Sequence, residues 1–242
     1  MIRVPSLKDI LRYETGPLGL DLDEATLAGF DQFYELLVEA NQRFNLTSLV
    51  TVEDVAVKHF LDSLLAVPVI RRNPGARLID VGSGAGLPGL ALKLTLPDLQ
   101  LALLEATRKK CSFMESAARS LGLEGVHVVW GRAEDAASDT RHREGYDFAV
   151  ARAVAEIRVL AEYCLPFVAV GGLFIAYKGP SAREELAGAA ESLRILGGQA
   201  EQLLEYQLPR GGGGRFLVCI RKVSKTPETY PRRAGAPKKK PL

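Results

Sequence analysis

The sequence predicts an α/β protein built on a seven-stranded, doubly wound, Rossmann-like sheet. From residue 76 onward, short apolar runs alternate with amphipathic helical patterns, and a glycine-rich turn follows the first run. The last two runs are joined by the four-glycine loop "PRGGGGR" with no helix between them. Alternating strands and helices indicate a parallel sheet, whereas a short glycine loop indicates an antiparallel hairpin at the sheet edge.

Each element follows from its pattern. We expect strands at 77–81, 100–105, 127–130, 147–152, 172–178, 202–208 and 216–222. Helices are expected between them at 88–94, 109–121, 155–168 and 182–196, and a polar connector at 134–144. Residues 5–70 are expected to be helical, with one amphipathic helix over 27–44 and a second from Val52 to about Pro68.

The composition is that of a globular protein with a sizeable core. The chain has 242 residues, of which 47% are hydrophobic and 25% charged. No apolar run approaches the roughly 18 residues of a membrane span, and the N-terminus lacks a signal-peptide pattern, so we expect a cytoplasmic protein. The three cysteines and three histidines are scattered, so neither a disulfide framework nor a metal site is expected.

The turn "GSGAGLPG" after the first strand fits two nucleotide-binding patterns. Its later glycines match the dinucleotide pattern G-x-G-x-x-G, whereas Asp80, Gly82, Gly84 and Gly86 match the pattern D-x-G-x-G-x-G of S-adenosylmethionine (SAM) enzymes. Pro88 removes an N–H that a pyrophosphate needs at the helix start. An acid at position 80 suits the cationic amino-acid end of SAM. These features favour SAM over NAD.

Acidic residues also follow the second and third strands. Glu105 is placed to hold ribose hydroxyls, which both cofactors carry. Glu134 or Asp135 can accept a hydrogen bond from an adenine amino group, and the backbone at Ala133 can meet the ring edge. The expected cofactor-binding residues are Asp80, Gly82, Gly84, Gly86, Leu87, Glu105, Ala106, Thr107, Ala133, Glu134 and Arg152.

Motifs along nearly the whole chain resemble the bacterial ribosomal RNA small subunit methyltransferase G family, also called glucose-inhibited division protein B. They are "NLTS" at 45–48, "KHFLDSL" at 58–64, "DVGSGAGLPG" at 80–89, "RKKCSFM" at 108–114, "GRAED" at 131–135, "ARAVA" at 151–155, "YKG" at 177–179 and the ending "YPRRAGAPKKKPL". Leu87 replaces a frequent bulkier aromatic residue of the family, and Glu105-Ala106 replaces a frequent Asp-Ser. These departures concern details of cofactor contact.

The resemblance implies transfer of a methyl group from SAM, with S-adenosylhomocysteine as product, to N7 of a guanine in the decoding-region hairpin loop of 16S rRNA. N7 carries a lone pair and no proton, so the reaction needs no general base and depends on positioning and electrostatics. Cys164 lies inside an expected helix, which disfavours a covalent cysteine mechanism. Two alternatives stay open at this point: an NAD-dependent oxidoreductase, and a non-catalytic module that binds SAM and RNA.

Arg152 ends the fourth strand and is the expected catalytic residue, touching SAM or the target base. An ion pair with Asp80 or Glu105 is its structural alternative. By resemblance, Asn45 and Thr47 flank the active site, with helix capping as the alternative. Lys178 follows the fifth strand, where a cation can meet RNA phosphate. His59 and Asp62 share a helix face, which we interpret as a helix-surface hydrogen bond.

The C-terminal tail concentrates the basic charge. Residues 221–242 carry a net charge of +7 and the rest of the chain −5, which suggests a polyanionic partner. Prolines argue against a helix there, so we expect an extended strip along phosphates that contributes to RNA affinity and not to SAM affinity. The expected RNA-binding residues of this strip are Arg232, Arg233, Lys238, Lys239 and Lys240.

The chain is therefore expected to have three parts. These are a helical N-terminal extension packed on the core at 1–70, a SAM-binding methyltransferase core at 71–223, and a basic RNA-binding tail at 224–242. The expected partner is 16S rRNA in the small ribosomal subunit or its precursor. We expect a monomer that needs neither a membrane nor a metal ion.

Overall fold

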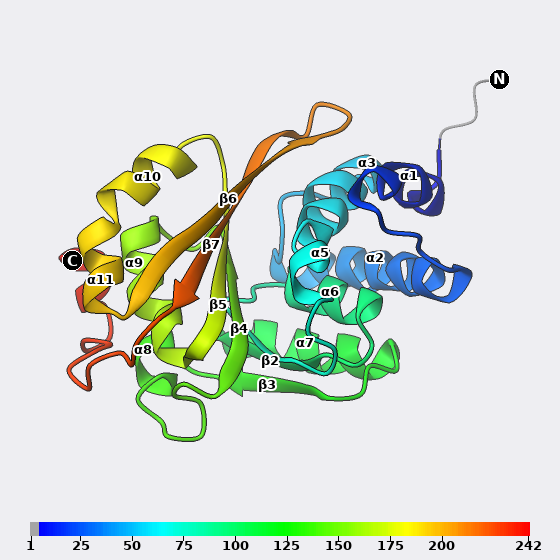
Figure 1. The fold of residues 1–242 in the computed structure, drawn as a ribbon. Coiled ribbons are helices and arrows are strands. Elements are labelled where there is room, and N and C mark those ends of the chain that lie inside the picture. The colour runs from blue at the N-terminus through cyan, green and yellow to red at the C-terminus, as the bar shows by residue number, and fades with distance from the viewer. Residues whose placement is uncertain (1–4) are drawn as a thin grey trace.

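A seven-stranded sheet with helices on both faces forms the centre of the computed structural model, which describes residues 5–242, without the side chain of Phe44 (Figure 1). The strand order is β3-β2-β1-β4-β5-β7-β6, and β7 runs antiparallel to both of its neighbours, β5 and β6. This confirms the predicted doubly wound sheet with a hairpin at its edge. The strands are β1 (Arg77–Val81), β2 (Gln100–Glu105), β3 (Val126–Trp130), β4 (Tyr146–Arg152), β5 (Val168–Lys178), β6 (Gly198–Leu208) and β7 (Gly213–Lys222).

Helices alternate with the strands of the sheet. One face carries α6 (Gly89–Thr95) and α7 (Arg108–Ser120), and the other carries α9 (Ile157–Cys164), α10 (Ala182–Gly188) and α11 (Ala190–Ile195) (Figure 1). A 3₁₀ turn, Leu165–Phe167, extends α9. The connector after β3, predicted to be polar, contains one helical turn, α8 (Ala133–Ala136), which places Glu134 in a buried position.

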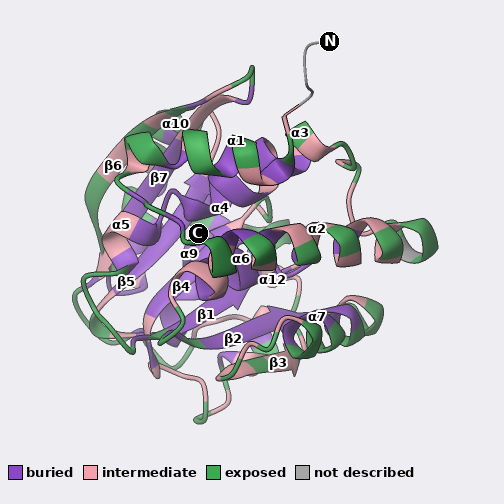
Figure 2. Cartoon of the chain, turned by 90° about the vertical axis from the view of Figure 1, so that its right-hand side faces the viewer, coloured by how far each residue is buried: buried purple, intermediate pink, exposed green. Residues whose placement is uncertain are grey.

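The N-terminal part is helical and shares its core with the sheet. It contains α1 (Leu7–Glu14), a 3₁₀ turn (Gly16–Leu18), α2 (Glu24–Phe44), α3 (Val52–Asp54), a π-helix (Val55–Leu61), α4 (Asp62–Leu64) and α5 (Val67–Ile70). Phe60 of the π-helix packs against Phe30 and Phe33 of α2, with ring centroids 5.0 and 5.3 Å apart. Figure 2 shows burial along the strands, and mixed buried and exposed positions on α2 and α7.

The second predicted N-terminal helix differs from the observed one. The pattern predicted a single helix from Val52 to about Pro68, but the helix ends at Leu64 and Pro68 lies in the first turn of the separate helix α5. Proline lacks an N–H and is tolerated only in a first turn, so it begins a helix here. The π-helix was not predicted, because its wider turn leaves no pattern of its own.

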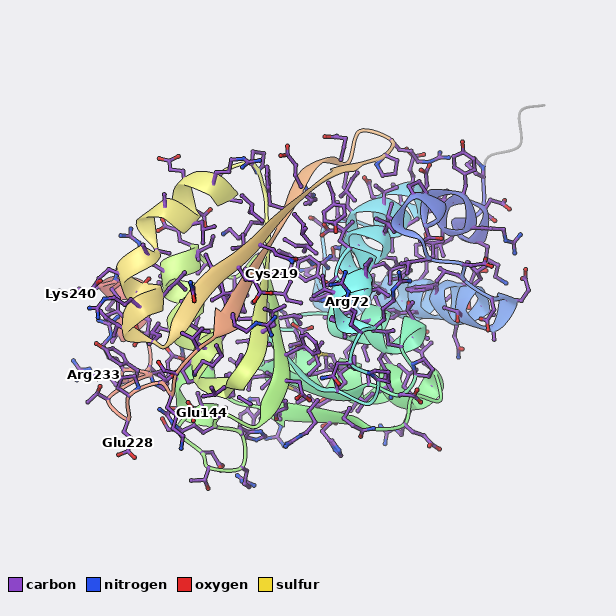
Figure 3. The ribbon with its side chains drawn as sticks, viewed as in Figure 1. Arg72, Glu144, Cys219, Glu228, Arg233 and Lys240 are labelled. Carbon is purple, nitrogen blue, oxygen red and sulfur yellow. The ribbon has the colours of Figure 1, made fainter. Side chains whose placement is uncertain are left out.

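The tail after β7 folds back against the sheet. It contains a four-residue helix, α12 (Ala236–Lys239), which packs against α9. The prediction that prolines exclude a helix here was wrong, because Pro237 occupies the first turn, where a missing N–H costs nothing. Arg233 and Lys240 lie at the edge of the molecule opposite α2 (Figure 3).

Candidate active site

Two adjoining cavities lie at the carboxyl ends of the parallel strands. The larger, of about 570 Å³, is lined by residues that follow β1, β4 and β5 and by the N-terminal helices. The smaller, of about 200 Å³, lies where β1, β2 and β3 end. Gly82 and Val154 line both cavities. The two cavities therefore meet over the turn after β1, which suits a ligand with two distinct parts.

The glycines of this turn have different roles. Gly84 lines the larger cavity at a φ of 59°, and a Cβ there would meet only the Gly82 carbonyl oxygen, at 4.0 Å. Gly86, at a φ of 82°, lines neither cavity, and a Cβ there would lie 2.5 Å from Leu90 Cδ1. Gly84 thus leaves room for a ligand, whereas Gly86 allows α6 to pack closely. Leu87 lines the larger cavity beside Gly84.

Asp80 is fully buried at the end of β1 and lines neither cavity. Its Oδ2 accepts a hydrogen bond from the Gly89 N–H at 2.8 Å, and its Oδ1 has no partner among the described residues. Burial raises the pKa of Asp80 to about 7, although the bond from Gly89 acts in the opposite direction. This placement supports a role in fastening α6 to β1, and not the predicted contact with the cationic end of SAM.

Glu105 is held beside the smaller cavity by backbone amides. Gly84 N donates to Glu105 Oε2 at 3.1 Å, and Thr107 N donates to Oε1 at 2.8 Å. Each carboxylate oxygen can accept a second bond, so the group is oriented and still available to ligand hydroxyls. Ala106 lines the same cavity, whereas Thr107 contributes only its backbone amide to Glu105.

Ala133 and Glu134 line the smaller cavity from α8. Glu134 is 6% exposed, and its Oε1 accepts a hydrogen bond from the Gly235 N–H at 2.7 Å. Its Oε2 has no hydrogen-bond partner among the described residues. Tyr163 of α9 lies on the wall of the same cavity. One oxygen of Glu134 is therefore fixed, and the other is available to a donor on a ligand.

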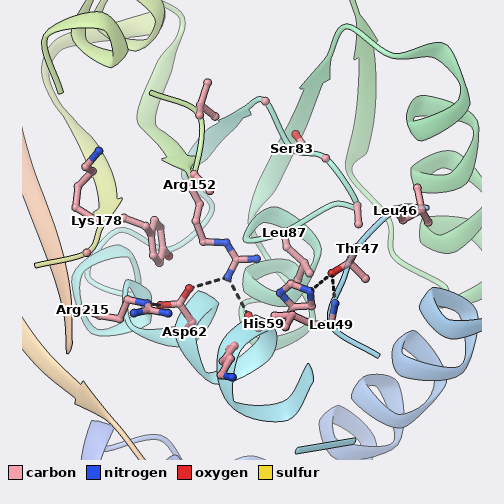
Figure 4. Close-up of a pocket in the computed structure, with 18 of the residues that line it drawn as sticks. Leu46, Thr47, Leu49, His59, Asp62, Ser83, Leu87, Arg152, Lys178 and Arg215 are labelled. Carbon is pink, nitrogen blue, oxygen red and sulfur yellow. Dashed lines mark hydrogen bonds and ion pairs between the residues drawn. The ribbon is translucent and has the colours of Figure 1, made fainter. Parts of the chain in front are cut away.

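Arg152 connects the sheet to the N-terminal helices in the larger cavity (Figure 4). Its Nη1 donates to Asp62 Oδ2 at 2.9 Å, to the His59 carbonyl oxygen at 3.1 Å and to Ser63 Oγ at 3.2 Å. Arg215 Nε donates to the other Asp62 oxygen at 3.1 Å. Asp62 is 3% exposed; burial raises the pKa of its carboxyl, and the two arginines act in the opposite direction.

The structural alternative considered for Arg152, an ion pair with Asp80 or Glu105, and the expected pairing of Asp62 with His59 are both absent among the described residues. Asp80 and Glu105 are already bonded to backbone amides, and the partner of Arg152 is Asp62, 90 residues away in sequence. Asp62 is thus a shared acceptor for two arginines and not part of a helix-surface pair with His59. The sequence signal that could have marked Asp62 as a site residue was the motif "KHFLDSL", which contains both His59 and Asp62.

Thr47 and His59 meet on the wall of the larger cavity, close to Arg152. Thr47 Oγ1 lies 2.8 Å from His59 Nε2 and accepts a bond from Leu49 N at 3.0 Å (Figure 4). Burial, followed by the charge of Arg152, lowers the pKa of His59 to about 4, so the imidazole is neutral near pH 7. Asn45 does not line the cavity; it ends α2 in a left-handed conformation, which is the capping alternative.

The other predicted RNA contacts are placed differently from one another. Lys178 lines the larger cavity, but its Nζ donates to the Ala155 carbonyl at 2.9 Å and pairs with Glu185 at 2.6 Å. Arg232 is paired with Glu162. The remaining tail residues are exposed and line neither cavity; they are Arg233, Lys238, Lys239 and Lys240. An extended strip formed by all five tail residues is therefore not what the structure contains.

Comparison with known proteins identifies the family. A family model described as rRNA small subunit methyltransferase G matches residues 26–210. The ribosomal RNA small subunit methyltransferase G of Pelotomaculum thermopropionicum is 45% identical over 236 residues, covering 98% of this chain and 99% of the relative. That of Moorella thermoacetica is 46% identical over 224 residues, covering 93% of each. The chain belongs to the ribosomal RNA small subunit methyltransferase G family.

Solved structures extend this result to the fold. A SAM-dependent methyltransferase from Aquifex aeolicus aligns with a TM-score of 0.52 at 17% identity, over 67% of this chain and 92% of its own. A ribosomal protein L11 methylase from Lactobacillus delbrueckii aligns with a TM-score of 0.53 at 16% identity, over 69% and 79%. At such identities the likeness concerns the fold alone, which is that of SAM methyltransferases.

Membership of the rRNA small subunit methyltransferase G family and this fold make the chain a SAM-dependent methyltransferase. The oxidoreductase alternative was therefore wrong. The helix-start amide of Gly89 is taken by Asp80, so a pyrophosphate would meet a carboxylate there. The residues present fit SAM, because open space over Gly84 continues to the oriented carboxylates of Glu105 and Glu134.

Proposed function

We propose that the chain transfers a methyl group from SAM to N7 of a guanine in the decoding-region hairpin loop of 16S rRNA, within the small ribosomal subunit or its precursor. The names of the relatives support the RNA class, because both are ribosomal RNA small subunit methyltransferases. The position of the target guanine within the RNA is inferred from the motifs that resemble the family. SAM supplies an electrophilic methyl group, and the chain positions the base that accepts it.

The observation that favours N7 is the state of the basic groups around the larger cavity. Both oxygens of Asp62 accept bonds from arginines, and His59 Nε2 is bonded to Thr47. Glu185 accepts from Ser181 and the Ile157 N–H and pairs with Lys178. These bonds give each of the three groups a structural role in the wall of the cavity. Guanine N7 has no proton to lose, so this arrangement suits attack by its lone pair.

Arg152 is the proposed catalytic residue. All of its hydrogen bonds to the described residues come from Nη1, which leaves Nε and Nη2 for a ligand. A guanidinium can donate to guanine O6, which leaves the N7 lone pair free, or stack on the base, and it can also bind the carboxylate of SAM. We assign it the task of orienting the reacting groups where the two cavities meet.

The remaining parts of the proposal concern the cellular setting. No helix in the described part of the chain is long and apolar enough to cross a membrane. Within residues 5–242, no three His, Cys, Asp or Glu side chains are grouped so as to hold a metal ion. We propose a monomer that acts in the cytoplasm on ribosomal particles without a metal ion.

The test is methylation of small subunits, their precursors and naked 16S rRNA with labelled SAM, followed by borohydride–aniline cleavage to locate N7-methylguanine. We expect cleavage at one guanine with the wild-type chain and none with Arg152→Ala. Arg158→Ala, which breaks an exposed ion pair with Glu156 on α9, is the matched control and should leave methylation intact. Binding of SAM without label in any particle would establish the non-catalytic alternative instead.

A further inference from the structure

The segment Thr226–Pro237, which we call the C-terminal strap, is fastened to the core at its start. Lys222 Nζ, fully buried at the end of β7, donates to the Leu165 carbonyl and to Thr226 Oγ1. Arg143 donates to the carbonyl oxygens of Thr226 and Tyr230 at 2.8 and 2.9 Å. The buried Lys222 and the half-buried Arg143 together fix the start of the strap, so it leaves β7 along one defined path.

A second attachment lies on α9. Glu162 is fully buried, and its carboxylate accepts bonds from the Arg232 backbone N–H at 2.8 Å, from Nε at 2.9 Å and from Nη2 at 2.6 Å. A fully buried carboxylate is costly unless it is paired and hydrogen-bonded, so Arg232 is committed to this contact. The next residue on α9 is Tyr163, which lines the smaller cavity.

The third attachment reaches the cavity itself. The Gly235 N–H donates to Glu134 Oε1 at 2.7 Å, and Pro237, two residues further on, is buried in the first turn of α12. A glutamate side chain has several rotamers, and a charge-assisted bond to one oxygen holds the carboxylate in one of them. Glu134 Oε2 then faces the cavity in one orientation, which lowers the entropic cost of binding a ligand there.

From these contacts we infer that the C-terminal strap is part of the cofactor site: it positions Glu134 to accept the amino group of adenine, and Arg232 anchors it. This inference rests on the proposed place of adenine in the smaller cavity. Arg232 and Gly235 are positioning residues, because they act through Glu162 and Glu134. The inference replaces the expectation that the tail contributes to RNA affinity alone.

The test compares two shortened chains by calorimetric titration. A chain ending at Arg233 loses the Gly235 amide but keeps the Arg232–Glu162 contact. A chain ending at Pro237 keeps both and loses the three lysines together with Pro241 and Leu242. The ligands are S-adenosylhomocysteine and its analogue with a hydrogen atom in place of the adenine amino group. We expect the Arg233 ending to weaken S-adenosylhomocysteine binding roughly tenfold and the Pro237 ending to leave it unchanged.

The analogue without the amino group separates positioning from general loosening. It offers Glu134 no donor at this position, so its affinity should be the same in the chain ending at Arg233 as in the full-length chain. Equal weakening of both ligands would overturn the inference, and so would wild-type affinity for S-adenosylhomocysteine. Full-length Arg232→Lys keeps the charge against Glu162 without the planar fork, and a smaller loss restricted to the amino-bearing ligand is expected.

The readout is independent of the proposed reaction. Ligand affinities are measured without RNA, so a failure to methylate N7 would leave the inference standing. Loss of amino-group discrimination in full-length Glu134→Gln would support the place of adenine. If Glu134→Gln still prefers the amino-bearing ligand as strongly as the wild type, adenine lies elsewhere and the strap inference fails with it.

Discussion

Arg152 Nη1 lies 2.9 Å from Asp62 Oδ2, and this ion pair joins the end of β4 to the start of α4. Its side chains are 13% and 5% exposed, so water screens the pair only weakly. Arg215, at the start of β7, binds the other oxygen of Asp62. The N-terminal helices therefore form part of the candidate active site, because they supply the acid that holds the proposed catalytic arginine.

Replacing Asp62 by Asn should impair both stability and catalysis. The amide keeps the size of the side chain but leaves two arginines without their counter-charge, and breaking such a pair costs about 3 kcal/mol of unfolding free energy. The rate of methyl transfer should fall as well, because Arg152 loses its orientation. Urea unfolding and single-turnover methylation are the measurements. Asp54→Asn, which breaks the more exposed pair with Lys58, should change both quantities much less. Equal effects of the two substitutions would contradict the assigned role of Asp62.

The sequence predicted the sheet well because each strand carries its own local signal. The strands predicted at 77–81 and 100–105 have the same bounds as the observed β1 and β2. The hairpin at the sheet edge was predicted from the glycines of its loop. The partners of Arg152 and Arg232 could not be predicted in this way, because Asp62 and Glu162 are 90 and 70 residues distant from them. Several carboxylates were equally plausible partners, and only tertiary packing decides among them.

The lowered pKa of His59 predicts a specific pH dependence of stability. The folded imidazole has a pKa of about 4, whereas an unfolded one has a pKa of about 6.5, so the unfolded chain binds the extra proton between these values. Stability is therefore retained above pH 6.5 and lost as the pH falls toward 4. From pH 7 to pH 5 we expect a loss of about 2 kcal/mol from this group.

Urea unfolding of the wild type and of His59→Gln from pH 7 to pH 5 measures this contribution. Glutamine keeps a hydrogen-bonding group toward Thr47 but does not titrate, so its profile should be flatter by that amount. His127→Gln, a change at an exposed histidine on β3, is the matched control and should retain the wild-type profile. A parallel profile for His59→Gln would show that this imidazole does not carry the effect.

Two glycines of the turn after β1 should separate cofactor binding from stability. Gly84→Ala is expected to cost about 1 kcal/mol through its positive φ and to weaken S-adenosylhomocysteine binding, because the new methyl group enters space over the larger cavity. Gly86→Ala adds a clash with Leu90 and should cost about 3 kcal/mol. At temperatures where Gly86→Ala is folded, its affinity for S-adenosylhomocysteine should change less than that of Gly84→Ala. Thermal unfolding and calorimetry distinguish the two variants, and the reverse order of binding losses would refute this division.

Lys178 should act on the loop after β4 and not on RNA phosphate. Its Nζ binds the Ala155 carbonyl and Glu185, and Glu185 in turn accepts from the Ile157 N–H, so the pair closes the loop that carries Val154. Lys178→Gln should lower kcat/KM roughly tenfold and leave the salt dependence of RNA binding unchanged.

Lys110, which lines the same cavity and forms no ion pair among the described residues, is the contrasting site. Lys110→Gln should reduce the slope of log K against log salt by about 0.7 to 0.9, because one phosphate contact is lost. If Lys178→Gln alone reduces the slope, its ammonium leaves Glu185 to bind RNA, and the loop is held by other contacts.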